Sequence, residues 1–203
     1  MLSPFTAPSS IKLLAVGWTA IRALDSCPAF PAEQRYIALT NDAVVLRTSN
    51  AHHKLFLWQD PASGEYRNTI VDEQPAASVP SDGLVQLVRP GDSVFLIAGF
   101  GQDAEAAQLL DLAAQAQLAG GKARVIGTAP EGPGYTKEQQ TALSQINLLK
   151  QHLLPPVVVP FGRNMLLRQS SPDTEIMTLY RIVDRMLIKT VQRVTGKQLC
   201  RQG

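Results

Sequence analysis

The hydrophobic pattern is clearest at 93–118, where a short apolar run is followed by a longer amphipathic segment. Residues 93–98 read SVFLIA, with four large apolar residues in succession and no polar alternation. A run of this length and kind indicates a strand buried on both faces, which is typical of the middle of a parallel sheet. After two glycines, the leucines and alanines of 102–118 recur at helical spacing. Strand, glycine turn and helix form half of a right-handed βαβ unit, so the sequence predicts an α/β domain with a mostly parallel sheet.

Other apolar runs predict the remaining elements. The expected strands are 11–17, 36–39, 54–58, 93–98, 123–127 and 154–160. The expected helices are 18–24, 81–88 with Ser81 or Asp82 as cap, 102–118, 136–152 with Thr136 as cap, and 174–195. The polar stretch 60–80 is broken by prolines and a glycine, which predicts a long loop. Alternating strands and helices predict three layers, with helices on both faces of the sheet.

A chain of 203 residues is long enough for one domain with a sizeable core. We expect a flexible arm at 1–10, a single domain at 11–196 and a tail at 197–203. The first residues lack the basic and apolar regions of a signal peptide, and no apolar run approaches the roughly 18 residues of a membrane span. Cys27 and Cys200 have no CxxC spacing, and two isolated cysteines are typical of a reducing compartment. The sequence therefore predicts a cytoplasmic protein.

Charge is unevenly distributed along the chain. Residues 1–147 carry 10 Lys and Arg against 14 Asp and Glu, whereas 148–203 carry 9 against 3, which gives −4 and +6. Much of the positive charge lies on the predicted helix 174–195. Its basic residues form a stripe at i, i+4 spacing, opposite its main apolar face. The stripe consists of Arg181, Arg185, Lys189 and Arg193, and the main apolar face of Ile176, Leu179, Val183, Leu187 and Val191.

Further apolar residues widen the flanks of this helix beyond what a surface helix requires. We therefore expect a protein–protein interface here, because large exposed apolar patches commonly mark interfaces. The expected interface residues are Met177, Arg181, Ile182, Arg185, Met186, Ile188, Lys189 and Arg193. The alternatives are an ordinary solvated helix face, or a tail or loop that folds back over the flanks.

Five stretches in this order resemble the N-terminal GTPase domain of the FtsZ/tubulin family. They are IKLLAVG at 11–17, ALTNDAVVL at 38–46, GDSVFLIAGFG at 91–101, SQINLLKQHLLPPVVVPFGRNML at 144–166 and LYRIVDRMLIKTVQRVTG at 179–196. The resemblance implies a Rossmann-like, three-layer α/β domain with a GTP or GDP site at the ends of its strands. It further implies a partner that is a second copy of the chain or an FtsZ-type protein.

The resemblance also implies roles for single residues. Gly17, Gly99 and Gly101 match the glycine-rich loops that wrap the phosphates in the family. Tyr180 matches the aromatic residue that stacks on guanine, and Asp184, one turn later, matches the residue that binds the guanine edge. Asn164 matches an asparagine after the sixth strand, with a small insertion. The alternative is that Tyr180 is a core residue and that Asp184 pairs with Arg181 or another neighbour on the helix.

The phosphate loops depart from the family pattern GGGTGTG. Gln102, Asp103, Ala104 and Glu105 follow Gly101, and two carboxylates would repel a triphosphate. The first phosphate loop of the family is reduced here to Gly17, which the bulky Trp18 follows. The loop that contacts the γ-phosphate in the family has no counterpart in 60–80. The resemblance ends at the long helix and does not include the second domain of the family. The sequence therefore predicts weak or absent phosphate binding and no hydrolysis.

Other site classes receive little support. His52 and His53 are adjacent and would point to opposite faces of a strand, so no metal site is expected. No serine lies on a nucleophile elbow, and we expect no catalytic residues. Gly99 and Gly101 with Ala104 make an incomplete dinucleotide fingerprint. The basic stripe lacks the interleaved aromatics of nucleic-acid sites.

The sequence thus predicts an FtsZ-like protein without a functional GTPase site. We expect it to act as a protein-binding, scaffold or regulatory factor, with cell division as the setting and without enzymatic activity. The alternative is a residual guanine-nucleotide-binding protein or slow GTPase, and any bound GTP or GDP would be held weakly.

Overall fold

The computed structural model describes residues 10–27, 30, 34–71, 83–132, 136–162 and 176–197. The strands are β1 Ile11–Val16, β2 Gln34–Thr40, β3 His53–Gln59, β4 Tyr66–Ile70, β5 Ser93–Gly99, β6 Lys122–Pro130 and β7 Val157–Phe161. The helices are α1 Gly17–Asp25, α2 Ala43–Thr48, α3 Gly83–Leu87, α4 Ala106–Leu118, α5 Thr136–Gln151 and α7 Ile176–Thr195.

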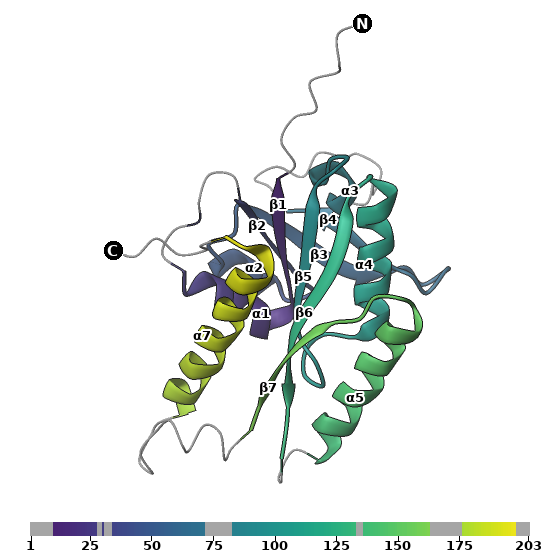
Figure 1. The fold of residues 1–203 in the computed structure, drawn as a ribbon. Coiled ribbons are helices and arrows are strands. Elements are labelled where there is room, and N and C mark those ends of the chain that lie inside the picture. The colour runs from purple at the N-terminus through teal and green to yellow at the C-terminus, as the bar shows by residue number, and fades with distance from the viewer. Residues whose placement is uncertain are drawn as a thin grey trace, which may run out of the picture.

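The strands form one seven-stranded sheet in the order β4-β3-β2-β1-β5-β6-β7. Every neighbouring pair is parallel except β3 and β4, which are antiparallel. Residues of α3, α4 and α5 belong to the apolar cluster on one face, and residues of α1, α2 and α7 to the cluster on the other (Figure 1). The predicted α/β class, with three layers and a mostly parallel sheet, is confirmed.

Strand β5 lies beside the central strand β1 and is buried on both faces. Val94 and Leu96 point into the cluster with α4, whereas Phe95 and Ile97 point into the cluster with α1 and α7. All four side chains are at most 4% exposed. The unbroken apolar run reflects this burial on two faces, as predicted.

Helix α7 packs its apolar face on the sheet, but its flanks differ from the prediction. Val183, Leu187 and Val191 are buried, as expected. Ile188 was expected to be partly uncovered, and this is wrong: the residue is 8% exposed and belongs to the cluster that also contains α1 residues, because α1 packs beside α7. Ile182 and Met186 are half-buried, the four residues of the basic stripe are exposed, and the side chains of Ile176, Met177 and Leu179 lie outside the described part of the chain.

The predicted long loop at 60–80 contains a strand, so that prediction is wrong in part. Strand β4 pairs with β3, and its polar Asn68 is 1% exposed. The Asn68 side chain donates to Gln115 Oε1 at 2.6 Å and accepts from the Leu84 N–H at 2.7 Å. Because its polar atoms are satisfied inside the fold, a residue typical of loops lies in a buried strand position. Residues 72–80 lie outside the description.

Helix α4 begins at Ala106 rather than at the predicted 102. Residues 101–103 form a turn, and the Glu105 N–H donates to Gln108 Oε1 at 3.1 Å where the helix starts. After its last turn, Gly120 has a φ of +81°, a left-handed conformation that glycine commonly adopts where a helix ends.

Several remaining expectations concern the ends of elements and the cysteines. Most of the arm 1–10 and the tail 197–203, and the caps Ser81 and Asp82, fall outside the described residues.

Cys27 is disulfide-bonded, so the interpretation of two isolated cysteines, on which the cytoplasmic location partly rested, is wrong for this residue. In the described part of the chain, no helix is long and apolar enough to span a membrane.

Candidate functional site

The sheet has a switch point between β1 and β5. The helix that follows β1 contributes to one apolar cluster, and the helix that follows β5 contributes to the other. In open α/β sheets, ligands bind outside the carboxyl ends of the strands at such a point. Gly17 directly follows β1 and Gly99 ends β5, so two of the predicted phosphate-loop glycines lie at this switch point.

The side chains of the loop after β5 fill part of the switch point. Asp103 Oδ2 accepts a 2.6 Å hydrogen bond from the Thr19 N–H, and Gln102 Oε1 accepts one of 2.8 Å from Thr19 Oγ1. A Cβ atom at Gly17 would lie 2.8 Å from Asp103 Cγ, and one at Gly99 would lie 2.9 Å from Asp103 Oδ1. These glycines therefore admit a carboxylate of the chain itself. Asp103 stands at the N-terminus of α1, where the helix dipole and free N–H groups favour an anion.

The Asp103 residue is exposed to solvent, but its carboxyl group points toward the Thr19 N–H. Burial raises the pKa of its carboxyl group, while hydrogen bonds from Thr19 act in the opposite direction. Desolvation is the larger of the two effects, so the ionised side chain carries a cost in stability, which the exposure of the residue to solvent keeps small.

Replacement of Asp103 by asparagine should remove this cost. Because the pKa is raised above 3.8 in the folded protein, the folded state binds the proton more readily than the unfolded chain. The cost is therefore present at neutral pH and disappears as the pH falls through the folded pKa to below 3.8. We expect Asp103→Asn, which keeps an oxygen to accept the hydrogen bond from the Thr19 N–H, to be at least as stable as the wild type at pH 7. As the pH falls, the free energy of unfolding of the wild type should rise relative to that of the variant.

Urea unfolding of both proteins between pH 7 and pH 3 measures this difference, with Glu138→Gln, at an exposed carboxyl on α5, as the control for loss of charge. A variant that is less stable by the same amount at every pH would show that the carboxylate is not under strain from burial.

Gly101 is turned away from the switch point. Its N–H donates to Gln145 Oε1 of α5 at 2.8 Å, and Gln145 Nε2 donates to the Ala104 carbonyl at 2.9 Å. Its φ is +73°, and a Cβ atom would clash with the Glu138 carbonyl oxygen. The Gly101 N–H is thus engaged by α5, and the role of Gly101 in binding phosphate stays a prediction.

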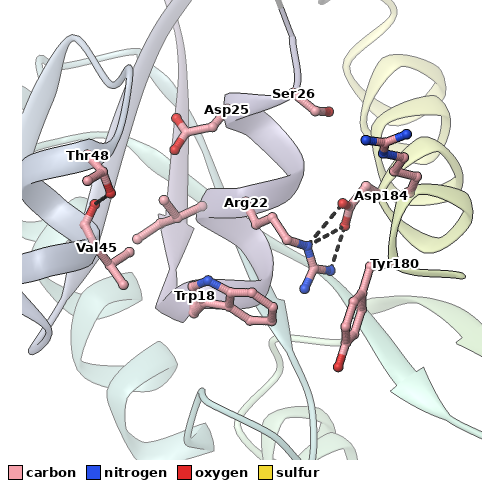
Figure 2. A pocket seen from close by; sticks show the side chains of 10 residues that line it. Trp18, Arg22, Asp25, Ser26, Val45, Thr48, Tyr180 and Asp184 are labelled. Carbon is pink, nitrogen blue, oxygen red and sulfur yellow. Dashed lines mark hydrogen bonds and ion pairs between the residues drawn. The ribbon is translucent and has the colours of Figure 1, made fainter. Parts of the chain in front are cut away.

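Tyr180 and Asp184 do lie together, and Arg22 of α1 occupies the space beside them (Figure 2). Arg22 donates from Nη2 to Asp184 Oδ1 at 2.7 Å and from Nε to Asp184 Oδ2 at 3.0 Å. Its Cζ lies 4.2 Å from the centroid of the Trp18 ring and 4.4 Å from that of Tyr180. The two rings are nearly perpendicular, with centroids 5.7 Å apart. The guanidinium group thus sits in the corner between two aromatic rings while both carboxylate oxygens of Asp184 are bonded to it.

This arrangement corrects the alternative that the sequence left open. Tyr180 is 37% exposed and is not a core residue, and the partner of Asp184 is Arg22 rather than Arg181. Arg22 Nη1 is buried without a hydrogen-bond partner, and the guanidinium group as a whole packs against the two neighbouring rings. Trp18 and Arg22 are spaced i, i+4 on one helix, a signal that sequence reasoning could have used to find this pair. Asn164 lies outside the described residues.

Clefts adjoin both parts of the site. Two clefts, of about 400 and 510 Å³, share Ser26, Arg181 and Asp184 and run between α1 and α7. Val45 and Thr48 of α2 also line the first cleft. A smaller polar cleft of about 160 Å³ lies at the strand ends near Asn41 and Asp103. Among the residues that the structure describes, no group of three or more His, Cys, Asp or Glu is placed to hold a metal ion.

No protein-family model matches the sequence, and no curated protein matches it. Solved structures do match. The chain is similar to the empty FtsZ dimer of M. jannaschii, with a TM-score of 0.68 and 18% identity over 97% of this chain and 57% of that one. It is similar to TubZ of Clostridium botulinum phage c-st, with a TM-score of 0.54 and 12% identity over 92% and 61%.

The GTPγS-form protofilament of Bacillus thuringiensis serovar israelensis TubZ also matches, with a TM-score of 0.53 and 10% identity over 92% of this chain and 56% of that one. The chain thus spans less than two thirds of the length of these structures. Together, the strand order, the long helix α7 and these similarities establish that the chain has an FtsZ/tubulin-like fold.

Proposed function

We propose that this chain is an FtsZ-like protein without a functional GTPase site, which acts as a protein-binding scaffold or regulatory factor. The observation that carries the proposal is the position of the Asp103 carboxylate, which accepts a hydrogen bond from the Thr19 N–H at the N-terminus of α1. A phosphate group at this position would have to displace a negatively charged side chain and meet its repulsion. We infer that the site cannot bind a triphosphate in the orientation that hydrolysis needs.

The other half of the expected site supports the same proposal. Arg22 uses both oxygens of Asp184 and packs against Tyr180, the residues that would hold a guanine edge and ring. A nucleobase would therefore have to break this hydrogen-bonded ion pair before it could bind. Internal groups occupy both ends of the expected nucleotide site, one anionic and one cationic.

The experiment that tests the GTPase part of the proposal is titration calorimetry with GTP and GDP, together with a phosphate-release assay. We expect weak or absent binding and no measurable hydrolysis. The FtsZ of M. jannaschii serves as the comparison protein. GTP turnover above background that is abolished by Gly99→Trp would refute the proposal.

A residual guanine-nucleotide-binding protein is the second candidate. The observation in its favour is that Tyr180 and Asp184 line one cleft of about 400 Å³. Under this alternative, a nucleotide would bind and Tyr180→Ala and Asp184→Ala would each weaken it. Nucleotide binding that is unchanged in both variants would exclude this mode of binding.

The protein-binding part of the proposal rests on the exposed side of α7. The matched FtsZ structure is described as a dimer and the matched TubZ structure as a protofilament, which supports a partner that is a second copy or an FtsZ-type protein. Ile188 is buried, so its replacement would report on folding, and exposed charges are better probes.

Sedimentation velocity of the chain alone and with an FtsZ-type protein tests for association. We expect a complex that Arg185→Glu/Lys189→Glu weakens. The matched control is Lys137→Glu/Lys150→Glu, which makes the same charge change at exposed positions of α5. A chain that remains a monomer and binds no FtsZ-type protein would contradict the protein-binding role.

A further inference from the structure

A continuous groove runs along the contact between α1 and α7. The two clefts that form it meet at Ser26, Arg181 and Asp184. One end is lined by Trp18 and Tyr180, which lie beside the ion pair of Arg22 (Figure 2). The other end follows α7 to Gln192.

The groove is positively charged along α7. Arg181, Arg185 and Lys189 line it, and Arg193 continues the same stripe by one turn. In the part of the chain that the structure describes, none of these four forms an ion pair. Residues 176–195 contain four basic residues and one acidic residue, or +3, whereas the whole chain has +2, so all other residues together sum to −1.

The two acidic residues that line the groove offset only part of this charge. Both oxygens of Asp184 are bonded to Arg22. Asp25 accepts hydrogen bonds from Ser49 Oγ at 3.0 Å and from the Asn50 N–H at 2.9 Å. The cations of the stripe are therefore left to meet negative charge from another molecule.

The end of the groove at Trp18 and Tyr180 offers apolar surface. Trp18 is 43% and Tyr180 is 37% exposed, and both rings are held in place by the Arg22 guanidinium. Rigid, partly exposed aromatic residues are common anchors of protein-binding sites. The groove thus combines an aromatic end with a row of unpaired cations.

We propose that this groove binds an acidic peptide segment of a partner protein. An apolar side chain of the segment packs against Trp18 and Tyr180, and its carboxylates meet the basic stripe. From Arg181 to Arg193 the helix rises about 18 Å, a length that about six residues of extended chain span. The proposal rests on the proposed function, since it names the chemistry of the protein partner.

Selection from a library of random twelve-residue peptides on the full chain tests this. We expect enrichment of peptides with net negative charge and at least one aliphatic or aromatic residue. A fluorescein-labelled copy of the enriched peptide should bind the wild type, and its affinity should fall at least tenfold in Arg185→Glu/Lys189→Glu and remain unchanged in Lys137→Glu/Lys150→Glu. Binding should also weaken as salt is added.

The fluorescence of Trp18 locates the peptide directly. In a Trp58→Phe background, Trp18 is the one remaining tryptophan of the chain. Its emission should shift when the peptide binds.

Enrichment of neutral or basic peptides, or a peptide that binds the charge-reversed protein equally well, would overturn the proposal. Tighter binding of labelled oligouridine RNA, lost in the same variant, would overturn it in favour of nucleic acid. If the acidic peptide fails while the chain still co-sediments with an FtsZ-type protein, the groove assignment falls and the proposed function stands.

Discussion

Replacement of Phe95 by alanine is expected to lower the free energy of unfolding by about 3–5 kcal/mol. Phe95 lies in β5, is 4% exposed and belongs to the apolar cluster between the sheet and α7. Its removal costs the transfer free energy of the ring and leaves a cavity that two parallel neighbour strands, β1 and β6, cannot easily close.

Urea unfolding with linear extrapolation measures the change. Phe56→Ala in β3 is the matched control. Because Phe56 is only half-buried, its replacement should lower the free energy of unfolding by a smaller amount. The average substitution lowers the free energy of unfolding by about 1 kcal/mol. A smaller loss in Phe95→Ala would be inconsistent with a packed sheet centre.

The central strands were predictable because a strand that is buried on both faces has consecutive apolar residues. In β5 each side chain meets an apolar layer, so the run shows no polar break. Strand β4 was missed for the opposite reason: the buried Asn68 is satisfied by Leu84 and Gln115, which lie 16 and 47 positions away. A local pattern cannot show that a polar residue has distant partners.

The candidate site was predictable only in its backbone. Gly17, which follows β1, and Gly99, which ends β5, mark the switch point. The resemblance places Tyr180 and Asp184 together. What fills the site depends on contacts that are remote in sequence, since Arg22 and Asp184 are 162 positions apart. The carboxylate of Asp103 was expected to repel a phosphate. Its turn inward, onto the Thr19 N–H, follows from the close approach of Gly17 and Gly99, which only the folded chain reveals.

Replacement of Arg22 by alanine is expected to destabilise the protein by roughly 3 kcal/mol, the lower end of the range for breaking a buried ion pair. Asp184 is 5% exposed, so without Arg22 its carboxylate would remain buried without the three hydrogen bonds that Arg22 donates. The lower end applies because the Arg22 side chain is 16% exposed and water can reach part of the gap. Trp18 and Tyr180 would also lose the cation between them.

A double-mutant cycle separates the ion pair from the packing of the arginine side chain. Arg22→Met keeps an unbranched chain, and Asp184→Leu removes the carboxylate. Each single variant should be destabilised, whereas the double variant should recover most of the loss, since an apolar pair of similar volume often replaces a buried ion pair at little cost. Urea unfolding of all four proteins gives the coupling free energy. Additive losses in the double variant would mean that Arg22 and Asp184 stabilise the fold independently and that the ion pair between them contributes little.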